Sequence, residues 1–440
     1  MESEYTEVRL GDLVKVEHGW PFKSEFFVEE AIGGPIVVNI GNFKYTGGFR
    51  FESTTIKKYV GTYPKAYELS PGDLLLVMTC QTPGGEILGI PGRIPNDGRL
   101  YLHNQRIGKV AFKDRERLDP RYLYYLCLGR DFNRTLCQTA SGTKILHTSP
   151  SRIEDFKFQL PAIAEQKRIA NILGALDDKI ELNRKMNETL EQAARALFKS
   201  WFVDFDPVHA KVAGRQPVGM DKTTAELFPD SFVASEQGKV PRGWKIVSVG
   251  EAVECVGGAT PSTAEPEYWE GGIHHWTTPK DFSSLASPFI LNTERKLTNA
   301  GISKISSGLL PAGTLLLSSR APIGYIAIAT IPVAINQGFI ALKCNEIASN
   351  FFMLNWCKAN MAEIKGRATG TTFPEISKQN FRPISVCLPP KELMSAFTAK
   401  VSPIYGKIVA NLRQTRNLST IRDTLLPGLL NGDIVTSTKP

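Results

Sequence analysis

Short apolar runs bounded by Pro and Gly recur in two long stretches of this chain. Such runs are typical of β-strands separated by turns. Strands are predicted at Leu74–Met78, Arg106–Val110, Leu315–Leu317 and Gly338–Leu342. Each stretch also contains one predicted helix, from Tyr122 to about Leu136 and from Phe351 to about Ile364. We therefore expect two similar mixed α+β domains of about 150 residues each.

A different pattern begins after Pro161, where apolar side chains recur at alternating steps of three and four residues up to about residue 202. The seam contains Ile169, Leu173, Leu176, Ile180, Leu190, Ala194, Leu197 and Trp201. Such spacing is typical of a coiled-coil helix, and about 40 residues of helix span roughly 60 Å. An apolar stripe of this length needs a partner.

The second half of the chain repeats the first, and this repeat supplies the partner. The offset drifts in the front of each copy, from 241 positions between Leu74 and Leu315 to 232 between Asn104 and Asn336. From Gly142 and Gly370 onward it stays at 228 positions. Each copy therefore has a variable front and a constant rear. Variation concentrates where loops carry function, on a scaffold that keeps its register.

At this constant offset the helical seam recurs from Phe397 to Leu429, and the polar Asn183 coincides with Asn411. A buried polar seam residue can fix the register and orientation of paired helices. We predict that the two helices pair as an antiparallel coiled coil and that the two copies form a pseudo-twofold repeat. An amphipathic core helix within each copy remains the alternative.

Composition restricts the class of protein. The chain has 440 residues, 42% of them hydrophobic and 22% charged, as in ordinary globular proteins. No run approaches the roughly 18 apolar residues of a membrane span, and the N-terminus does not resemble a signal peptide, so we expect a cytoplasmic protein. The seven cysteines and six histidines show no metal-ligand spacing. The net charge of +8 favours a polyanionic partner such as DNA.

Polar residues at the ends of the predicted strands are the candidates for DNA contact. Arg suits bidentate bonding to guanine, and Asn and Gln suit adenine. An Asn-Gln pair before a strand can instead be a turn cap that bonds its own backbone. The strand-end candidates are Thr79, Gln81, Arg93, Asn104 and Gln105 in the first copy, and Lys280, Ser318, Ser319, Arg320, Asn336 and Gln337 in the second.

Two small polar loops follow the predicted helices of the two copies. Their backbone N–H groups and hydroxyls could bind phosphate, although a plain turn into the next strand is equally consistent. The candidates are Ser141, Thr143 and Lys144 in the first loop, and Thr369, Thr371 and Thr372 in the second.

The first long helix ends in an aromatic segment, Leu197–Val208, which either packs under the second copy or binds another protein. Residues 211–243 predict a long polar connector rich in Gly and Pro. The second helix is expected to end within Leu425–Ile434, where Pro and Gly are the stop signals. The candidate partner-binding residues are Phe198, Trp201, Phe202, Phe205, Leu426 and Leu429.

Four motifs together resemble the specificity (S) subunit of type I restriction–modification systems, along essentially the whole chain. They are Leu160-Pro161 with Glu165-Gln166, the block Ala196–Phe205, Pro241–Trp244, and Leu425–Gly432. Leu388-Pro389 of the second copy lacks the following Glu-Gln pair, a departure that affects only the start of the second helix.

The resemblance implies two target-recognition domains, each reading one half of a bipartite, asymmetric DNA site. Between them, the helices would set the spacer and dock two methyltransferase (modification) subunits. Restriction/translocase subunits would complete the complex. The resemblance implies no cofactor on this chain; the partner subunits would use S-adenosylmethionine, and ATP with magnesium. We place the first domain at residues 1–160, a central helical region with linker at 161–241, the second domain at 242–388 and a C-terminal helical region at 389–440.

No catalytic motif is evident, so we expect a non-catalytic chain. An adenine methyltransferase would need an [ND]-P-P-[YFW] segment, and an ATPase would need a phosphate-binding loop; the chain has neither. Asp155-Phe156-Lys157 and Glu363-Ile364-Lys365 have a nuclease-like spacing, but no Pro-Asp lies a short distance upstream. Two other functions stay open: a stand-alone sequence-specific DNA-binding regulator, and a coiled-coil adaptor without DNA contact.

Overall fold

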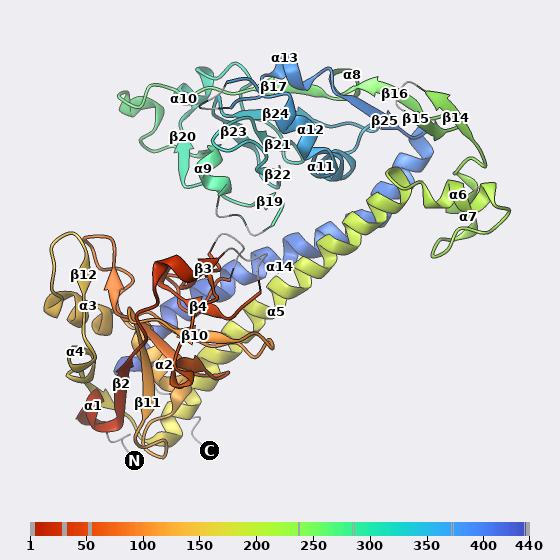
Figure 1. Cartoon of the computed structure of the whole chain (residues 1–440). Helices are drawn as coiled ribbons and strands as arrows, with labels where there is room; N and C mark the ends of the chain where they lie inside the picture. Colours follow the sequence, from red (N-terminus) through yellow and green to blue (C-terminus); the bar gives the residue numbers. More distant parts are fainter. Residues whose placement is uncertain are drawn as a thin grey trace. The chain divides into compact units, whose positions relative to one another are not determined.

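The computed structural model describes residues 5–28, 33–51, 55–235, 238–283, 285, 287–370, 372, 374–434 and 436 (Figure 1). The chain forms two compact units, of which unit 1 comprises residues 1–181 and 416–440 and unit 2 comprises residues 182–415. Each unit joins one α+β module to part of two long helices, α5 (Ile163–Phe202) and α14 (Lys391–Asn431). No helix in the described part of the chain is long and apolar enough to cross a membrane.

The module of unit 1, hereafter module one, is built on two sheets. An antiparallel sheet has the order β2 (Val14–His18), β11 (Ile107–Phe112), β7 (Leu74–Val77) and β9 (Pro91–Arg93). A mixed sheet has the order β3 (Phe27–Val28), β5 (Lys58–Tyr59), β4 (Ile36–Val38), β10 (Tyr101–His103) and β6 (Glu68–Leu69). Two strand pairs complete it: β1 (Thr6–Arg9) with β13 (Lys157–Leu160), and β8 (Thr79–Cys80) with β12 (Leu146–His147).

The module of unit 2, module two, repeats the first sheet and three strands of the second, since β20, β18 and β23 pair in the same order and directions as β5, β4 and β10. Its main sheet has the order β17 (Glu254–Gly257), β24 (Phe339–Lys343), β21 (Leu315–Ser318), β22 (Ile326–Ala329) and β19 (Phe289–Ile290). The smaller sheet has the order β20 (Arg295–Leu297), β18 (His274–Thr277) and β23 (Val333–Ile335). β16 (Lys245–Ser248) pairs with β25 (Ser385–Leu388). The four strands predicted from the sequence are therefore confirmed as β7, β11, β21 and β24.

The central strands explain why their sequences are apolar throughout. All four residues of β7 and of β21 are buried, because each strand lies between two neighbours and is covered on both faces. The core of unit 1 includes Leu75, Leu123 and Phe132, and the largest core of unit 2 includes Leu315, Phe352 and Phe397. Short helices close the loops: α1 (Leu10–Leu13), α4 (Pro150–Glu154), α8 (Val249–Ala252), α9 (Pro279–Phe282), α10 (Asn299–Ser303) and α13 (Lys378–Phe381).

The prediction of a single helix in each module is wrong, because two shorter helices occupy each of these segments. In module one α2 (Pro120–Leu128) and α3 (Arg130–Thr139) are separated at Gly129, whose backbone is extended at φ −63° and ψ 139°. In module two α11 (Asn350–Ala359) and α12 (Met361–Gly366) are separated at Asn360. Amphipathic periodicity continues across both breaks, so it could not reveal them.

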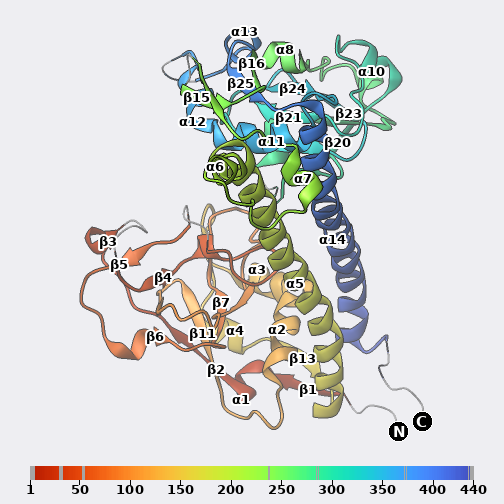
Figure 2. The same cartoon turned by 90° about the vertical axis from the view of Figure 1, so that its right-hand side faces the viewer.

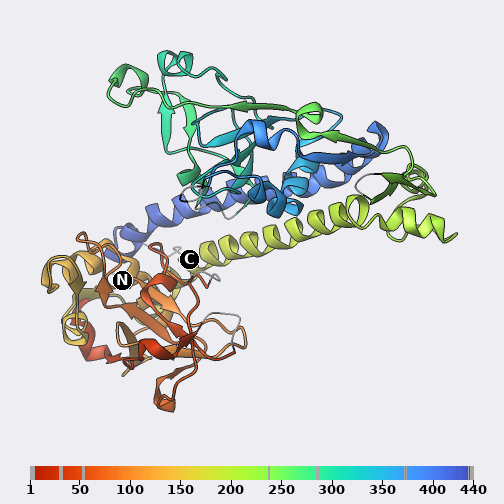
Figure 3. The ribbon, with the colours of Figure 1, turned by 45° about the horizontal axis from the view of Figure 1, so that its top comes forward.

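The long helices α5 and α14 run side by side (Figures 2 and 3), and the antiparallel pairing predicted from the repeat is confirmed within each unit. In unit 1 Arg422 Nη1 donates to Asp177 Oδ1 at 2.8 Å. In unit 2 Asn411 Nδ2 donates to Asn187 Oδ1 at 2.8 Å, and Asn183 Nδ2 donates to Gln414 Oε1 at 2.9 Å. The three asparagines are buried and form the polar layer of the seam.

The second helix ends within the predicted segment Leu425–Ile434, at its last glycine and not at Pro427. α14 continues to Asn431 and ends at Gly432, which adopts φ 77°, the left-handed conformation that glycine favours at a helix end. Leu429 and Leu430 of this last turn are buried in the core of unit 1. Tertiary packing of these leucines therefore outweighs the helix-breaking tendency of Pro427.

The connector predicted at residues 211–243 is largely folded. α6 (Asp206–Val212) and α7 (Lys222–Glu226) are followed by a hairpin of β14 (Phe232–Ser235) and β15 (Gly238–Pro241). Phe228 is buried in the main core of unit 2, and its ring centroid lies 5.1 Å from that of Trp201. Buried aromatic residues thus anchor a segment that composition alone predicts to be loop.

Candidate nucleic-acid interface

The same backbone hydrogen bonds bring three candidate segments together at one end of each module. In module one Met78 N–H donates to Arg106 O at 3.0 Å, and Thr148 N–H donates to Met78 O at 2.9 Å. In module two Ser319 N–H donates to Gly338 O at 2.8 Å, and Ile376 N–H donates to Ser319 O at 3.0 Å. The segment after the central strand, the Asn-Gln turn and the small polar loop are therefore neighbours in both modules.

The small polar loops are short hairpins. Ser141 and His147 exchange two backbone hydrogen bonds of 2.9 and 2.8 Å, and Thr369 and Glu375 exchange two of 2.9 Å. Gly142 at φ 102° and Gly370 at φ 95° make the turns possible, because other residues rarely adopt this conformation. The candidates Ser141, Thr143, Lys144, Thr369 and Thr372 are exposed. Thr371 lies outside the described residues.

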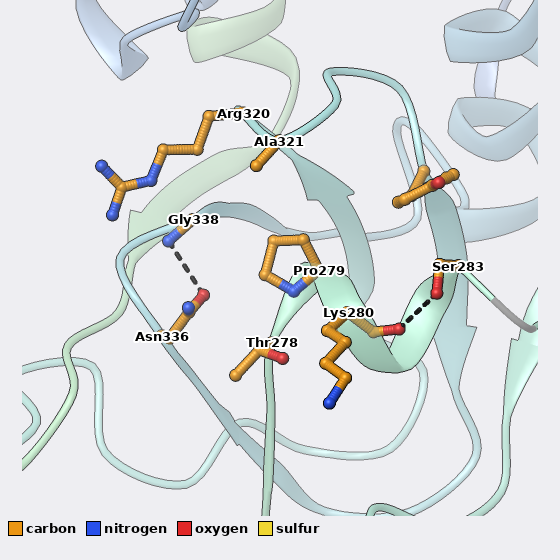
Figure 4. Close-up of a pocket in the computed structure, with 9 residues that line it drawn as sticks. Thr278, Pro279, Lys280, Ser283, Arg320, Ala321, Asn336 and Gly338 are labelled. Carbon is orange, nitrogen blue, oxygen red and sulfur yellow. Dashed lines mark hydrogen bonds between the residues drawn. The ribbon is translucent and has the colours of Figure 1, made fainter. Parts of the chain in front are cut away.

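Module two presents an open cavity of about 390 Å³ next to these segments (Figure 4). α9 contributes Lys280, the turn after β21 contributes Arg320, and the turn before β24 contributes Asn336. Lys280 is exposed and Arg320 is partly exposed. Three predicted contact residues from separate parts of the sequence thus line one basic cavity, a suitable surface for a polyanion.

Thr79, Ser318 and Ser319 were predicted to contact DNA, but all three side chains are buried inside the protein. The Thr79 hydroxyl lies 3.1 Å from His147 Nδ1. Ser318 Oγ donates to Pro322 O at 2.7 Å and accepts from Tyr325 N–H at 2.8 Å, so it holds the turn that carries Arg320. Gln81, by contrast, is exposed as expected of a contact residue.

Arg93, predicted as a DNA-contacting residue, is half-buried and makes contacts within module one. Its Nη2 donates to Pro120 O at 2.6 Å, and the guanidinium carbon lies 5.3 Å from the ring centroid of Tyr124. Burial lowers the pKa of Arg93. The side chain joins the edge strand β9 to the start of α2.

The asparagines of the two Asn-Gln pairs are turn caps, which was the alternative to DNA contact. Asn104 Oδ1 accepts from Arg106 N–H at 3.0 Å, and Asn336 Oδ1 accepts from Gly338 N–H at 2.9 Å. Both asparagines therefore cap the turn before the next strand. Gln105 and Gln337 are exposed, and Gln337 Oε1 accepts from Thr260 Oγ1 at 2.7 Å.

The predicted partner-binding aromatics belong to the core. Phe198, Trp201 and Phe202 are buried, and the rings of Phe202 and Phe397 lie 4.9 Å apart. Phe205 is partly buried against Trp244, and in unit 1 Leu426 packs on the core in which Leu429 is buried. Of the two readings of the aromatic segment, packing under module two is the one that the structure shows.

Two residues that the sequence reasoning missed lie beside the candidates. His147 and Glu375 end the two small hairpins, and each contacts the residue two positions after its central strand, Thr79 or Arg320. The constant offset of 228 positions aligns His147 with Glu375 and could have revealed them. Among the described residues no group of three His, Cys, Asp or Glu side chains is arranged to bind a metal.

Comparisons with known proteins agree with this architecture. The chain is 27% identical over an alignment of 479 residues to the type I restriction enzyme HindI specificity subunit of Haemophilus influenzae, covering 98% of this chain and 100% of that protein. The MjaIX specificity subunit of Methanocaldococcus jannaschii is 36% identical over 189 residues, 42% of this chain and 43% of that protein.

A solved structure has a similar fold. The crystal structure of a type I restriction–modification system S subunit from M. genitalium matches with a TM-score of 0.54 and 17% identity, covering 98% of this chain and 96% of that one. The family model described as the type I restriction modification DNA specificity domain matches residues 2–192 and 241–397. Because this model covers most of the chain, in two copies, the chain belongs to the type I restriction modification DNA specificity family.

Proposed function

We propose that this chain is the non-catalytic DNA specificity subunit of a type I restriction–modification complex, in which each module reads one half of a bipartite DNA sequence. The observation that carries this proposal is the repeated frame. In both modules the same backbone hydrogen bonds gather three loops at one end, while the side chains on those loops differ. A shared frame with different exposed side chains suits two readers that bind two different sequences.

The two half-sites should differ, which makes the complete site asymmetric. The fronts of the modules are built differently: a five-stranded mixed sheet accompanies the main sheet of module one, and a three-stranded sheet accompanies that of module two. Such differences place different loops beside the shared frame. A target with two unlike halves and an unspecified spacer follows, with α5 and α14 connecting the readers.

The partners would be two methyltransferase subunits that use S-adenosylmethionine, and restriction/translocase subunits that use ATP with magnesium. The aromatic segment is buried, so docking must use other surfaces of the chain. The long helices offer exposed apolar side chains at Ile172, Leu182 and Ile421. Apolar side chains on a solvent-facing helix suit contact with a second protein.

The decisive experiment is to express the full chain with its methyltransferase subunit and to map methylated bases in the host genome by single-molecule sequencing. We expect methylation of adenine within a split, asymmetric sequence, and none when the chain is left out. A continuous palindrome, or methylation independent of the chain, would contradict the proposal.

Binding measurements on the chain alone separate the two other functions. Tight, sequence-specific DNA binding without any partner would favour a stand-alone regulator. A complex with the methyltransferase that neither binds nor methylates DNA specifically would favour an adaptor.

A further inference from the structure

The shared frame identifies one pair of positions at which the two modules differ in charge and in side-chain length. Thr79 pairs with His147 across β8 and β12. The equivalent residues in module two are Arg320 and Glu375, because Thr79 follows Met78 and Arg320 follows Ser319, the two residues whose backbones bond the neighbouring loops identically. We call these two pairs the exchange pairs.

We propose that the exchange pairs determine base choice, and that in module two Arg320, oriented by Glu375, bonds to a guanine in the half-site of that module. This inference rests on the proposed function, since it assigns a base to one residue of the proposed reading surface.

The first residues of the two exchange pairs, Thr79 and Arg320, differ in exposure and in side-chain length. The Thr79 side chain is short and buried, and its hydroxyl is engaged 3.1 Å from His147 Nδ1. The Arg320 side chain retains 39% of its exposure, and its Nη1 lies 3.5 Å from Glu375 Oε2. Module two therefore presents a long cation where module one presents no extended donor.

The geometry of Arg320 suits base contact. A guanidinium carries five N–H donors, and its loose pairing with Glu375 occupies one nitrogen, so the others stay available. Two parallel N–H groups match the O6 and N7 acceptors of guanine in the major groove. Figure 4 shows the Arg320 side chain extended above Gly338, and the turn that carries it is held by Ser318, whose Oγ donates to Pro322 O at 2.7 Å.

Glu375 argues for a base rather than a phosphate as the ligand. A carboxylate close to a phosphate is repelled by it, whereas a carboxylate 3.5 Å from one nitrogen of a guanidinium draws that group toward it and leaves two other N–H groups for a bidentate bond. Lys280, exposed on the same cavity, is the residue placed for backbone contact, because a flexible ammonium binds phosphate as a point charge. Lys280 would then position the module on the DNA backbone, and Arg320 would select the base.

The test uses the full chain in complex with its methyltransferase subunit. Methyl transfer is measured on a panel of duplexes in which each base pair of the two half-sites is replaced in turn. For Arg320→Lys and Arg320→Ala we expect a loss of roughly 5- to 150-fold in kcat/KM on the native duplex. Both variants should lose discrimination at one G·C pair in one half-site, while discrimination in the other half-site stays unchanged.

Lys391→Ala is the matched control, because Lys391 is an exposed cation of unit 2 that pairs with Glu346, and it should keep the native activity. Full activity of Arg320→Lys, or an equal loss on every duplex, would identify a phosphate contact and overturn the inference. Unchanged discrimination would overturn it as well. If the wild-type complex methylates no split sequence, the proposed function itself fails, a result distinguishable from all of these because it needs no variant.

Discussion

Residues that both modules share maintain the frame, as the turn caps Asn104 and Asn336 illustrate. Each places its amide oxygen on the backbone N–H two residues later, and in each case a strand of the main sheet follows. At the scale of a single residue, sharing therefore indicates a structural role.

His103, next to the cap Asn104, should make unit 1 sensitive to acid. Burial lowers its pKa to about 4, and its Nε2 donates to Ile107 O at 2.7 Å. The unfolded chain takes up this proton near pH 6.5, so the native state loses stability as the pH falls from about 6.5 toward 4, by about 3 kcal/mol in total.

Urea unfolding of the full chain at pH 7.5 and pH 5 checks this expectation. His103→Gln removes the titrating group and keeps a donor, so the difference between the two pH values should shrink by about 2 kcal/mol. His18→Gln is the control, because His18 is exposed in the same unit. Equal pH dependence of wild type and His103→Gln would refute the assignment.

At the scale of the element, the helix pair is stabilised by apolar seams on both sides of a polar layer. Asn183 and Asn411 occupy the same position in the repeat and meet across the pair, with Asn187 beside them. The Nδ2 groups of Asn183 and Asn411 find partners there, because an unbonded polar group in a buried seam is costly, whereas Asn183 Oδ1 accepts no hydrogen bond from the described residues. A shift of either helix by one turn would break these bonds, so the layer favours the observed register.

The polar layer should show the energetics of a buried pair. Asn411→Leu leaves Asn187 Oδ1 without its donor and should cost about 1–3 kcal/mol of the free energy of unfolding. The double variant Asn187→Leu with Asn411→Leu should recover most of this loss, because no polar atom of that pair then stays unbonded.

A double-mutant cycle by urea unfolding measures the coupling. Asn417→Leu, an exposed position on the same helix, is the control and should change stability little. Additive losses in the double variant would argue against a direct bond between the two amides.

At the scale of the whole molecule, the chain holds separate cores in its two units. Phe132 is buried in the core of unit 1, whereas Trp201 is buried in the main core of unit 2. Both long helices contribute to both units, since Ile169 and Leu429 belong to one core and Trp201 and Val401 to the other. The helices thus connect two bodies that are each stabilised by their own packing.

We expect two transitions in scanning calorimetry of the full chain. Phe132→Ala should lower one and Trp201→Ala the other, because truncating a buried aromatic side chain costs about 3–5 kcal/mol. Val218→Ala is a suitable control, since Val218 is 96% exposed. A single transition that both variants lower equally would show that the units unfold as one.

Local patterns in the sequence determined the repeat, the strands β7, β11, β21 and β24, and the antiparallel pairing of the long helices. Each of these follows from a spacing along the chain: apolar runs bounded by turns, steps of three and four, and a constant offset that aligns Asn183 with Asn411. Periodicity is visible without knowledge of distant contacts, which is why these features could be predicted.

Only the tertiary structure decided which polar and aromatic side chains face solvent. Arg93 and Thr79 look like contact residues in the sequence, and Trp201 looks like a docking residue, yet partners 27 or more positions away bury Thr79 and Trp201 and bind the half-buried Arg93. The same long-range packing carries α14 past Pro427 and sets Arg320 beside Glu375. Burial and pairing are properties of segments brought together in space, so no local pattern in this chain could have revealed them.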